Sequence, residues 1–300
     1  MPESEIKPER QLKEAIIKVL VFFDLFDHPL TAYEIWMKLD KKWGLTEILD
    51  FLDKEILKPA AALSQRSGFY FLVGREEITT IRQRRYNYSA EKMKIARRFA
   101  RIFSLLPFVR MVALANSLGQ YNSRAESDID FFIVSAPHRV WLARLYCTGL
   151  AKLLNRRPNA TDKKDKICLS FYVAADRLCL DDLRLQGEDP YFDYWRRSLV
   201  LLYNKDKTYE RFLEVNELSF GSVAVGAAIS PKPNIFLDKL EILAKRFQLA
   251  IMPAELKSSM NNSDGVVIND SILKLYRRDR RREYAEKYGN KINEILKEDN

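Results

Sequence analysis

The sequence predicts an α+β protein in which a small mixed sheet lies between helical parts of the chain. Residues 111–134 read MVALANSLGQYNSRAESDIDFFIV, where two apolar runs of strand length enclose a polar turn and loop. A continuous apolar run at residues 167–174 is typical of a third, buried strand. Apolar residues recur at helical spacing within the first 60 residues and again beyond residue 190. We therefore expect a sheet-containing core with helical flanks.

The composition is that of a globular protein with an affinity for anions. Of the 300 residues, 47% are hydrophobic and 30% are charged, and the net charge is +9. Acidic and basic side chains nearly balance in residues 1–75, so the basic surplus lies in the rest of the chain. A basic surplus favours polyanions such as nucleotides or nucleic acid as partners.

The sequence favours a cytoplasmic protein without a membrane partner. The longest weakly polar run, residues 218–230, is too short and too rich in Gly and Ser to span a bilayer. The first ten residues lack the apolar core of a signal peptide. Cys147, Cys168 and Cys179 show no metal-binding spacing, and we interpret them as reduced thiols, mainly of the core.

The N-terminal segment, residues 1–75, predicts three helices and a hairpin. Apolar spacing places helices at 10–26, 31–39 and 46–57, the second of them opened by a Thr31–Glu34 capping box. Two short β-like runs follow, at 61–64 and 69–73. This order of elements resembles a winged helix-turn-helix domain.

Such domains often bind DNA through their third helix. Here that helix carries Glu47, Asp50 and Asp53, which phosphates would repel. A packing or protein-contact module is therefore the preferred interpretation, and DNA reading is the alternative. His28 and His138, each beside a proline, are interpreted as structural.

A basic connector, residues 76–107, follows the N-terminal segment. From Ser89 onward its pattern is helical, and Tyr86 and Tyr88 lie among its basic residues. Basic and aromatic side chains together can clamp a nucleic-acid backbone and stack on its bases. The connector is either such a clamp or a solvated helix face. The candidate nucleic-acid contacts are Arg84, Arg85, Arg97 and Arg98.

The core, residues 108–185, carries the residues that predict chemistry. Asp128 and Asp130 flank Ile129 at the start of an apolar strand, and side chains two apart in a strand point to the same face. Two carboxylates about 6–7 Å apart on one face repel unless a cation lies between them. Mg²⁺ suits this arrangement, with Mn²⁺ as an alternative. Upstream, Asn116, Ser117 and Gly119 form a turn suited to phosphate.

A serine-containing turn followed by Ser-Asp-x-Asp on an apolar strand resembles the polymerase-beta-like nucleotidyltransferase superfamily. The matching residues are Ser117, Asp128 and Asp130, with Asn116 where the family usually has glycine. The resemblance implies an enzyme that transfers a nucleoside monophosphate from a nucleoside triphosphate to an acceptor hydroxyl. It implies that Asp128 and Asp130 are catalytic and bind the metal, and that Asn116, Ser117 and Gly119 hold the nucleotide. Arg124, in the loop before the acids, is either a phosphate contact or a solvated side chain.

In the resembled family a later strand carries a third acid. Here the strand at 167–174 has Ser170 at that position, with Asp165 before the strand and Asp176 after it. Asn116 and Ser170 both depart from the family pattern, so turnover is in question.

The C-terminal segment, residues 186–300, has mainly helical patterns. They cover 191–203, 208–218, 235–250 with Asn234 as a cap, and 272–296. Residues 221–233 and 257–265 have loop-like composition. No motif in this segment identifies an acceptor.

Three hypotheses follow. The first is a Mg²⁺-dependent nucleotidyltransferase whose acceptor the sequence does not identify, with an RNA or DNA end favoured by the basic connector. The second is a nucleotide- or nucleic-acid-binding regulatory protein of the same fold with weakened catalysis. The third is a DNA-binding regulator that acts through residues 1–75. The first hypothesis is favoured if Asp165 or Asp176 reaches the aspartate pair, and the second is favoured if neither does.

Overall fold

The structure, a computed structural model, describes residues 3–39, 43–58, 61–159, 161–218, 234–260 and 264–298. It is a mixed α+β fold, as the sequence predicted. The expected loop at 221–233 lies outside the described residues. Within the described ranges, no helix combines the length and apolar character needed to cross a membrane.

The chain forms two compact units, which we call the first unit and the sheet unit. The first unit comprises Met1–Asn87, Gly187–Tyr194 and Arg280–Asn300, and the sheet unit comprises Tyr88–Gln186 and Trp195–Asp279. The chain therefore enters each unit more than once.

The first unit contains the predicted helices and hairpin. Its elements are α1 (Glu3–Asp24), α2 (Ala32–Lys38), α3 (Leu45–Glu55), the antiparallel strands β1 (Leu63–Arg66) and β2 (Phe69–Leu72), the start of α4 (Ile78–Ser104), the start of α7 (Pro190–Arg197), and α11 (Arg281–Glu298). The capping box of α2 is present: the Glu34 amide donates to Thr31 Oγ1 at 3.2 Å, and the Thr31 amide donates to Glu34 Oε2 at 2.9 Å.

Aromatic side chains fill the core of the first unit. Phe22 and Phe23 of α1 are fully buried, and Tyr288 of α11 packs against Phe22 with ring centroids 6.3 Å apart. Trp43 is buried, and its carbonyl oxygen accepts a hydrogen bond from Trp36 Nε1 at 3.2 Å. Trp43 is a member of this core, and the partly buried Trp36 packs against it.

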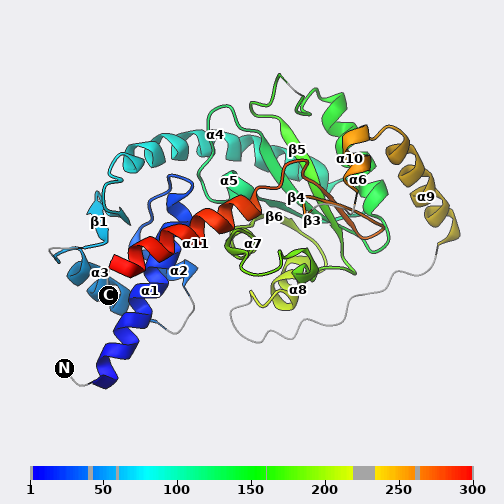
Figure 1. Cartoon of the computed structure of the whole chain (residues 1–300). Coiled ribbons are helices and arrows are strands. Elements are labelled where there is room, and N and C mark those ends of the chain that lie inside the picture. The colour runs from blue at the N-terminus through cyan, green and yellow to red at the C-terminus, as the bar shows by residue number, and fades with distance from the viewer. Residues whose placement is uncertain are drawn as a thin grey trace. The chain divides into compact units, whose positions relative to one another are not determined.

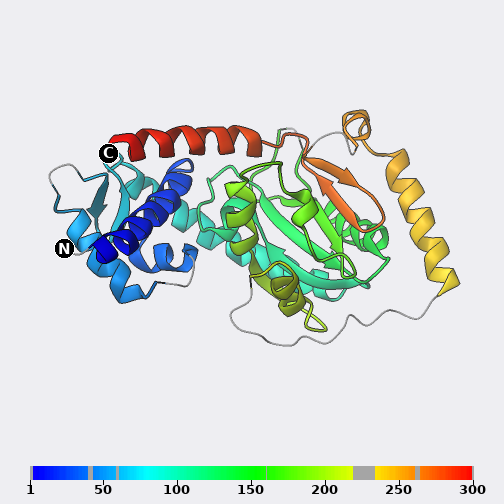
Figure 2. The same cartoon turned by 60° about the horizontal axis from the view of Figure 1, so that its bottom comes forward.

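The sheet unit is built on six strands. Its elements are the rest of α4, β3 (Val109–Leu114), α5 (Asn116–Gly119), β4 (Ile129–Ser135), α6 (Val140–Leu153), β5 (Ile167–Ala174), a 3₁₀ turn (Asp181–Leu183), the end of α7, β6 (Val200–Asn204), α8 (Thr208–Val215), α9 (Ile235–Ala250), α10 (Ala254–Ser258), β7 (Val266–Ile268) and β8 (Ile272–Leu275). The strand order is β6-β3-β4-β5-β8-β7, with β4 and β5 parallel and the other neighbours antiparallel (Figure 1). The β7–β8 hairpin forms one edge, orange in Figure 2.

The two faces of the sheet have different cores. Ile129, Phe131 and Ile133 of β4 belong to the cluster formed with α4 and α6. Phe132 points to the opposite face, where its ring centroid lies 5.1 Å from that of Phe171 and 5.6 Å from that of Trp195. Asp130, two residues before Phe132, belongs to this second face by alternation.

Three helix predictions need correction. The predicted helix at 191–203 ends at Arg197 and is followed by strand β6, and the predicted helix at 272–296 is strand β8 followed by α11. Short apolar runs such as VLLYN and ILKL are ambiguous by periodicity, and pairing with β3 and β5 makes them strands. The connector helix begins at Ile78, earlier than Ser89.

Candidate metal centre

The turn after β3 is fixed against the start of β4. The Ala115 amide donates to the Asp130 carbonyl oxygen at 3.0 Å, so the backbone of the turn is held beside the acids. Asn116 has a φ of 53°, in the left-handed region that asparagine tolerates better than most residues. A Cβ at Gly119 would lie 2.5 Å from the Ser198 carbonyl oxygen, so close backbone approach requires glycine there.

The turn is weaker as a phosphate site than the sequence suggested. Helix α5 has only four residues, so its aligned peptide dipoles are few. Ser117 Oγ lies 3.5 Å from Ser123 Oγ, and the Ser117 carbonyl oxygen accepts from the Asn122 amide at 2.8 Å. Ser117 therefore closes the loop 117–123 through both its hydroxyl and its carbonyl oxygen.

The structure brings Asp128 and Asp130 together and adds Cys168. One carboxylate oxygen from each aspartate and the Cys168 Sγ all lie within 4.8 Å of one another, and all three residues are half-buried. Around a tetrahedral ion, donor atoms that lie about 2.0–2.3 Å from the metal are roughly 3.3–3.7 Å apart. Where the three groups lie near the 4.8 Å limit, they must therefore move together by up to about 1.5 Å to share one divalent cation.

Like charge and burial make these groups resist ionisation. Burial raises the pKa of Asp130 to about 6, and the charge of Asp128 adds to the rise, while hydrogen bonds from Asn116 and Cys168 oppose it. Burial also raises the pKa of Asp128. Burial raises the pKa of the Cys168 thiol well above its ordinary value, and the two carboxylates add to that rise. A cation would reverse these effects, because it favours the ionised forms.

Helix α4 holds the loop that leads into the acids. Lys92, 2% exposed, donates from Nζ to the carbonyl oxygens of Ala125 at 3.1 Å and Ser127 at 2.7 Å, and pairs with Asp165 Oδ1 at 2.6 Å. One turn earlier, Ser89 Oγ accepts from the Ser123 amide at 3.0 Å. The one signal for Lys92 in the sequence is its place four residues before Ala96, on the apolar side of the helical pattern.

The third position of the site is taken by Cys168. In the parallel pairing of β4 and β5, Asp130 lies beside Cys168, while Ser170 Oγ lies 3.1 Å from Cys168 Sγ. Asp165 pairs with Lys92, and Asp176 lies 3.2 Å from His138 Nδ1. Neither acid joins the three-residue group found among the described residues. Cys168 is a free thiol, as expected, but it is only partly buried and lies beside the aspartate pair, whereas Cys147 is fully buried.

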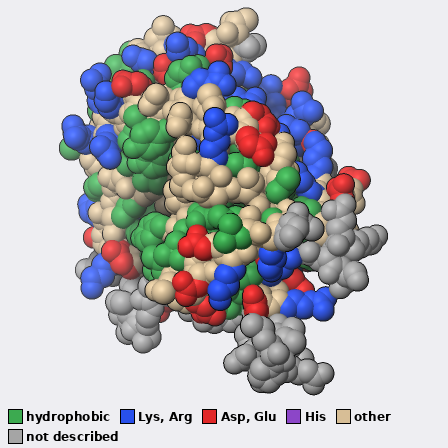
Figure 3. All heavy atoms as spheres, turned by 90° about the vertical axis from the view of Figure 1, so that its left-hand side faces the viewer, with side chains coloured by type: hydrophobic (Ala, Val, Ile, Leu, Met, Phe, Trp, Pro, Cys, Tyr) green, Lys and Arg blue, Asp and Glu red, His purple; other side chains and the backbone are tan. Residues whose placement is uncertain are grey.

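The basic residues of α4 have different surroundings. Arg85, in the first unit, donates to the Phe26 carbonyl oxygen at 2.6 Å and pairs with Asp27 at 2.9 Å. Arg84, Arg97 and Arg98 are exposed, as is Arg124 in the loop before the acids. On the face shown in Figure 3, basic and acidic side chains are interspersed. Arg85 is thus committed to internal contacts and is a weaker candidate for nucleic acid than Arg84, Arg97 and Arg98.

The acidic surface of α3 is also present in the structure. Glu47, Asp50 and Asp53 are exposed on this helix. His28 is buried, and its Nε2 lies 2.5 Å from Arg82 Nη1, which accords with a structural role.

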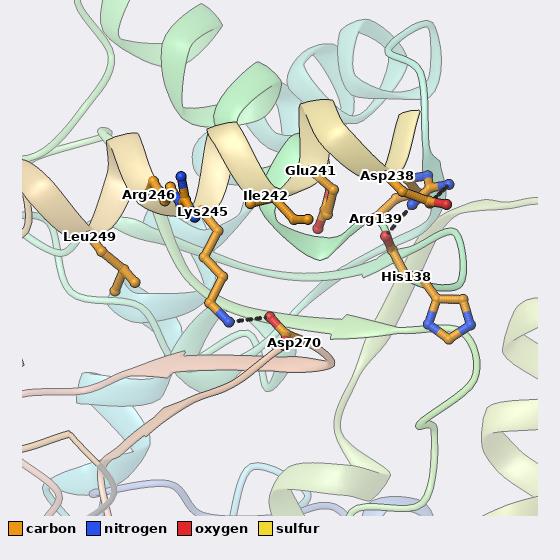
Figure 4. A pocket seen from close by; sticks show the side chains of 9 residues that line it. All are labelled: His138, Arg139, Asp238, Glu241, Ile242, Lys245, Arg246, Leu249 and Asp270. Carbon is orange, nitrogen blue, oxygen red and sulfur yellow. Dashed lines mark hydrogen bonds and ion pairs between the residues drawn. The ribbon is translucent and has the colours of Figure 1, made fainter. Parts of the chain in front are cut away.

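A separate cavity of about 380 Å³ lies between the segment that precedes α6, helix α9 and the turn that joins β7 to β8 (Figure 4). Its charges are largely matched within the wall: Arg139 pairs with Asp238 at 2.6 Å and Lys245 pairs with Asp270 at 2.7 Å. Glu241 accepts from the Trp141 amide at 2.7 Å and so caps the start of α6. None of the predicted site residues lines this cavity.

Comparison with known proteins leaves the site to be interpreted from its own geometry. The chain matched no protein-family model, no curated protein and no solved structure.

Proposed function

We propose that the protein is a metal-dependent nucleotidyltransferase whose centre is Asp128 and Asp130. The observation that carries the proposal is the convergence of both carboxylates at the start of β4, beside a turn tied to the same strand by the Ala115–Asp130 hydrogen bond. Two acids and a backbone turn at one strand end form an arrangement suited to a divalent cation and a triphosphate.

The chain's own residues define how substrates would be handled. Asp128 and Asp130 would hold the cation, which, when bound, would neutralise charge on the phosphates. The turn at Asn116–Gly119 would lie along the triphosphate, and Arg124, exposed in the next loop, would contact a terminal phosphate. Lys92 would keep the 125–127 backbone in place.

The reaction is an in-line displacement at the α-phosphorus. The oxygen of an acceptor hydroxyl forms a new bond to phosphorus, the bond to the bridging oxygen breaks, and pyrophosphate leaves with that electron pair. The proton of the hydroxyl passes to solvent. We expect an RNA or DNA end as the acceptor, because Arg97 and Arg98 leave an exposed basic surface on the α4 segment of the sheet unit.

A second function is favoured by one observation. The third member of the cluster is a thiol and not a carboxylate, so a site that binds nucleotide with little turnover is the alternative. In that case the protein would be a nucleotide-binding regulator. The exposed acids of α3 weigh against duplex DNA binding by the first unit.

The test is incubation of the full chain with each labelled nucleoside triphosphate, Mg²⁺ or Mn²⁺, and RNA, DNA or protein acceptors. We expect transfer by the wild type and by Asp50→Asn, an exposed acid of α3, and loss of transfer in Asp128→Asn and Asp130→Asn. Metal-dependent nucleotide binding without transfer would support the regulator. Equal transfer by all four proteins would refute this site.

A further inference from the structure

We propose that Cys168 is the third ligand of this centre, and that its thiolate makes the site prefer a borderline cation such as Zn²⁺ or Co²⁺ over Mg²⁺. The inference rests on the proposed function only in placing a cation at Asp128 and Asp130. It does not depend on nucleotide transfer.

A local irregularity in β5 places Cys168 at the site. Asp130 pairs with Cys168, but Phe132 pairs with Phe171, so β5 has one residue more than β4 between these two points. This extra residue is a β-bulge, which allows Cys168 to lie beside Asp130 while Phe171 still packs against Phe132. Bulges often occur next to functional sites, where they redirect one side chain.

The neighbouring groups orient all three donors. Ser170 Oγ lies 3.1 Å from Cys168 Sγ, and the Asn116 side chain hydrogen-bonds to Asp130. Lys92 holds the backbone that leads into Asp128. Such outer contacts fix the direction of metal ligands and strengthen binding.

The donor set selects the metal. Mg²⁺ takes oxygen ligands in near-octahedral geometry and gives up water reluctantly, so a sulfur at the third position disfavours it. Zn²⁺ accepts both thiolate sulfur and carboxylate oxygen, and three protein ligands leave its fourth position open. On the proposed function, a phosphate oxygen of the substrate would take that open position.

The other two cysteines lack this arrangement. Cys147 is fully buried, and Cys179 Sγ lies 3.7 Å from one carboxylate oxygen of Asp181. Among the described residues, neither belongs to a group of three ligand-type side chains. They are therefore matched controls for a thiol-specific signal.

The experiment titrates the metal-free full chain with Co²⁺ and follows the sulfur-to-cobalt charge-transfer absorption in the near ultraviolet. We expect this band in the wild type, Cys147→Ser and Cys179→Ser, and its loss in Cys168→Ser. Calorimetric titration should show that Cys168→Ser weakens Zn²⁺ binding by more than about tenfold. Loss of an outer contact alone costs at least about that much, and loss of a direct ligand should cost more. The weaker Mg²⁺ binding should change little.

A second variant keeps the inference testable if the serine variant is unstable. Cys168→Asp supplies a third carboxylate, and we expect it to bind Mg²⁺ more tightly than the wild type and to lack the cobalt band. A band that persists in Cys168→Ser, or a wild type without one, would overturn the inference. Transfer with Mg²⁺ in a wild type without the band would refute this inference and leave the proposed function standing. A band without transfer would support this inference and refute the proposed function.

Discussion

Asp27 in the first unit and Asp130 in the sheet unit are two partly buried aspartates with opposite surroundings. Asp27 receives Arg75 at 2.8 Å and Arg85 at 2.9 Å. Burial alone would raise its pKa, but these arginines lower it. Asp130 lies beside a second carboxylate and a thiol, and its pKa is raised.

The two aspartates differ in whether opposite or like charges surround them, and this separates a structural role from a ligand-binding one. In the first unit, the buried charges of Asp24, Arg82 and Asp189 each have an oppositely charged partner, which offsets the cost of their burial. At the candidate metal centre, like charges are held together, and none of the described ion pairs includes Asp128 or Asp130, although the charges of Lys163 and Lys92 partly offset that of Asp128. A site with an excess of negative charge would be stabilised by a bound cation.

The largest effect should come from breaking the matched network of the first unit. Arg82 is buried, donates to the Pro29 carbonyl oxygen at 3.0 Å and pairs with Glu34 at 2.6 Å. We expect Arg82→Met to lower the free energy of unfolding by about 3 kcal/mol, because it leaves these partners unpaired. Urea denaturation measures this loss. Arg84→Met, at an exposed position, is the control and should change stability by less than about 0.5 kcal/mol. Equal effects of the two variants would contradict the matched network.

The same substitution in the two aspartates should change the free energy of unfolding in opposite directions. In the metal-free protein at neutral pH, Asp130→Asn should stabilise the fold by about 2 kcal/mol, because it removes a disfavoured charge. Asp27→Asn should destabilise it by about 1 kcal/mol, since exposure to solvent weakens its ion pairs. Thermal unfolding of both variants without metal measures the two changes in stability. Destabilisation by both would show that Asp130 is not under repulsion.

The pH dependence follows from the raised pKa of Asp130. Its folded-state pKa of about 6 exceeds the ordinary 3.8, so between these values the folded state holds a proton that the unfolded state has lost. The stability contributed by this proton is present below pH 3.8 and is lost as the pH rises through about 6. The difference between wild type and Asp130→Asn across this range isolates the effect. Added divalent metal should reduce it, and an unchanged difference with metal would contradict binding at this carboxylate.

A smaller effect is expected at Lys92, which supports the candidate metal centre through the backbone. Lys92 holds the loop before Asp128 and pairs with Asp165, but it does not contact either site carboxylate through an ion pair. We expect Lys92→Met to weaken metal binding by about tenfold, or about 1.4 kcal/mol, as loss of an outer-shell contact does. Titration calorimetry measures the affinity. Lys94→Met, which breaks only an exposed pair with Glu91, should leave it unchanged.

The smallest effect on stability should come from the exposed arginines of α4. Arg97→Ala and Arg98→Ala should each change the free energy of unfolding by less than about 0.5 kcal/mol. If these residues contact nucleic acid, the double variant should bind single-stranded RNA or DNA more weakly and with a smaller dependence on salt. Fluorescence anisotropy at several salt concentrations measures both. An unchanged affinity and salt dependence would show that α4 is a solvated helix face.

Local patterns predicted much of the fold. Strand β5 has its predicted bounds because a charged loop precedes its apolar run, and α9 begins after Asn234, whose side chain accepts from the Leu237 amide at 3.1 Å. The predictions failed for β6 and β8, because short apolar runs become strands only when a neighbouring strand is present.

By itself, the sequence determined that Asp128 and Asp130 share a face, because alternation along a strand is a local property of the extended backbone. Only the tertiary structure decided that Cys168, and not Ser170, lies beside Asp130, and that Lys92 supports the loop before the acids. Register, bulges and contacts from a distant helix depend on how separate segments pack. No single stretch of sequence contains that information.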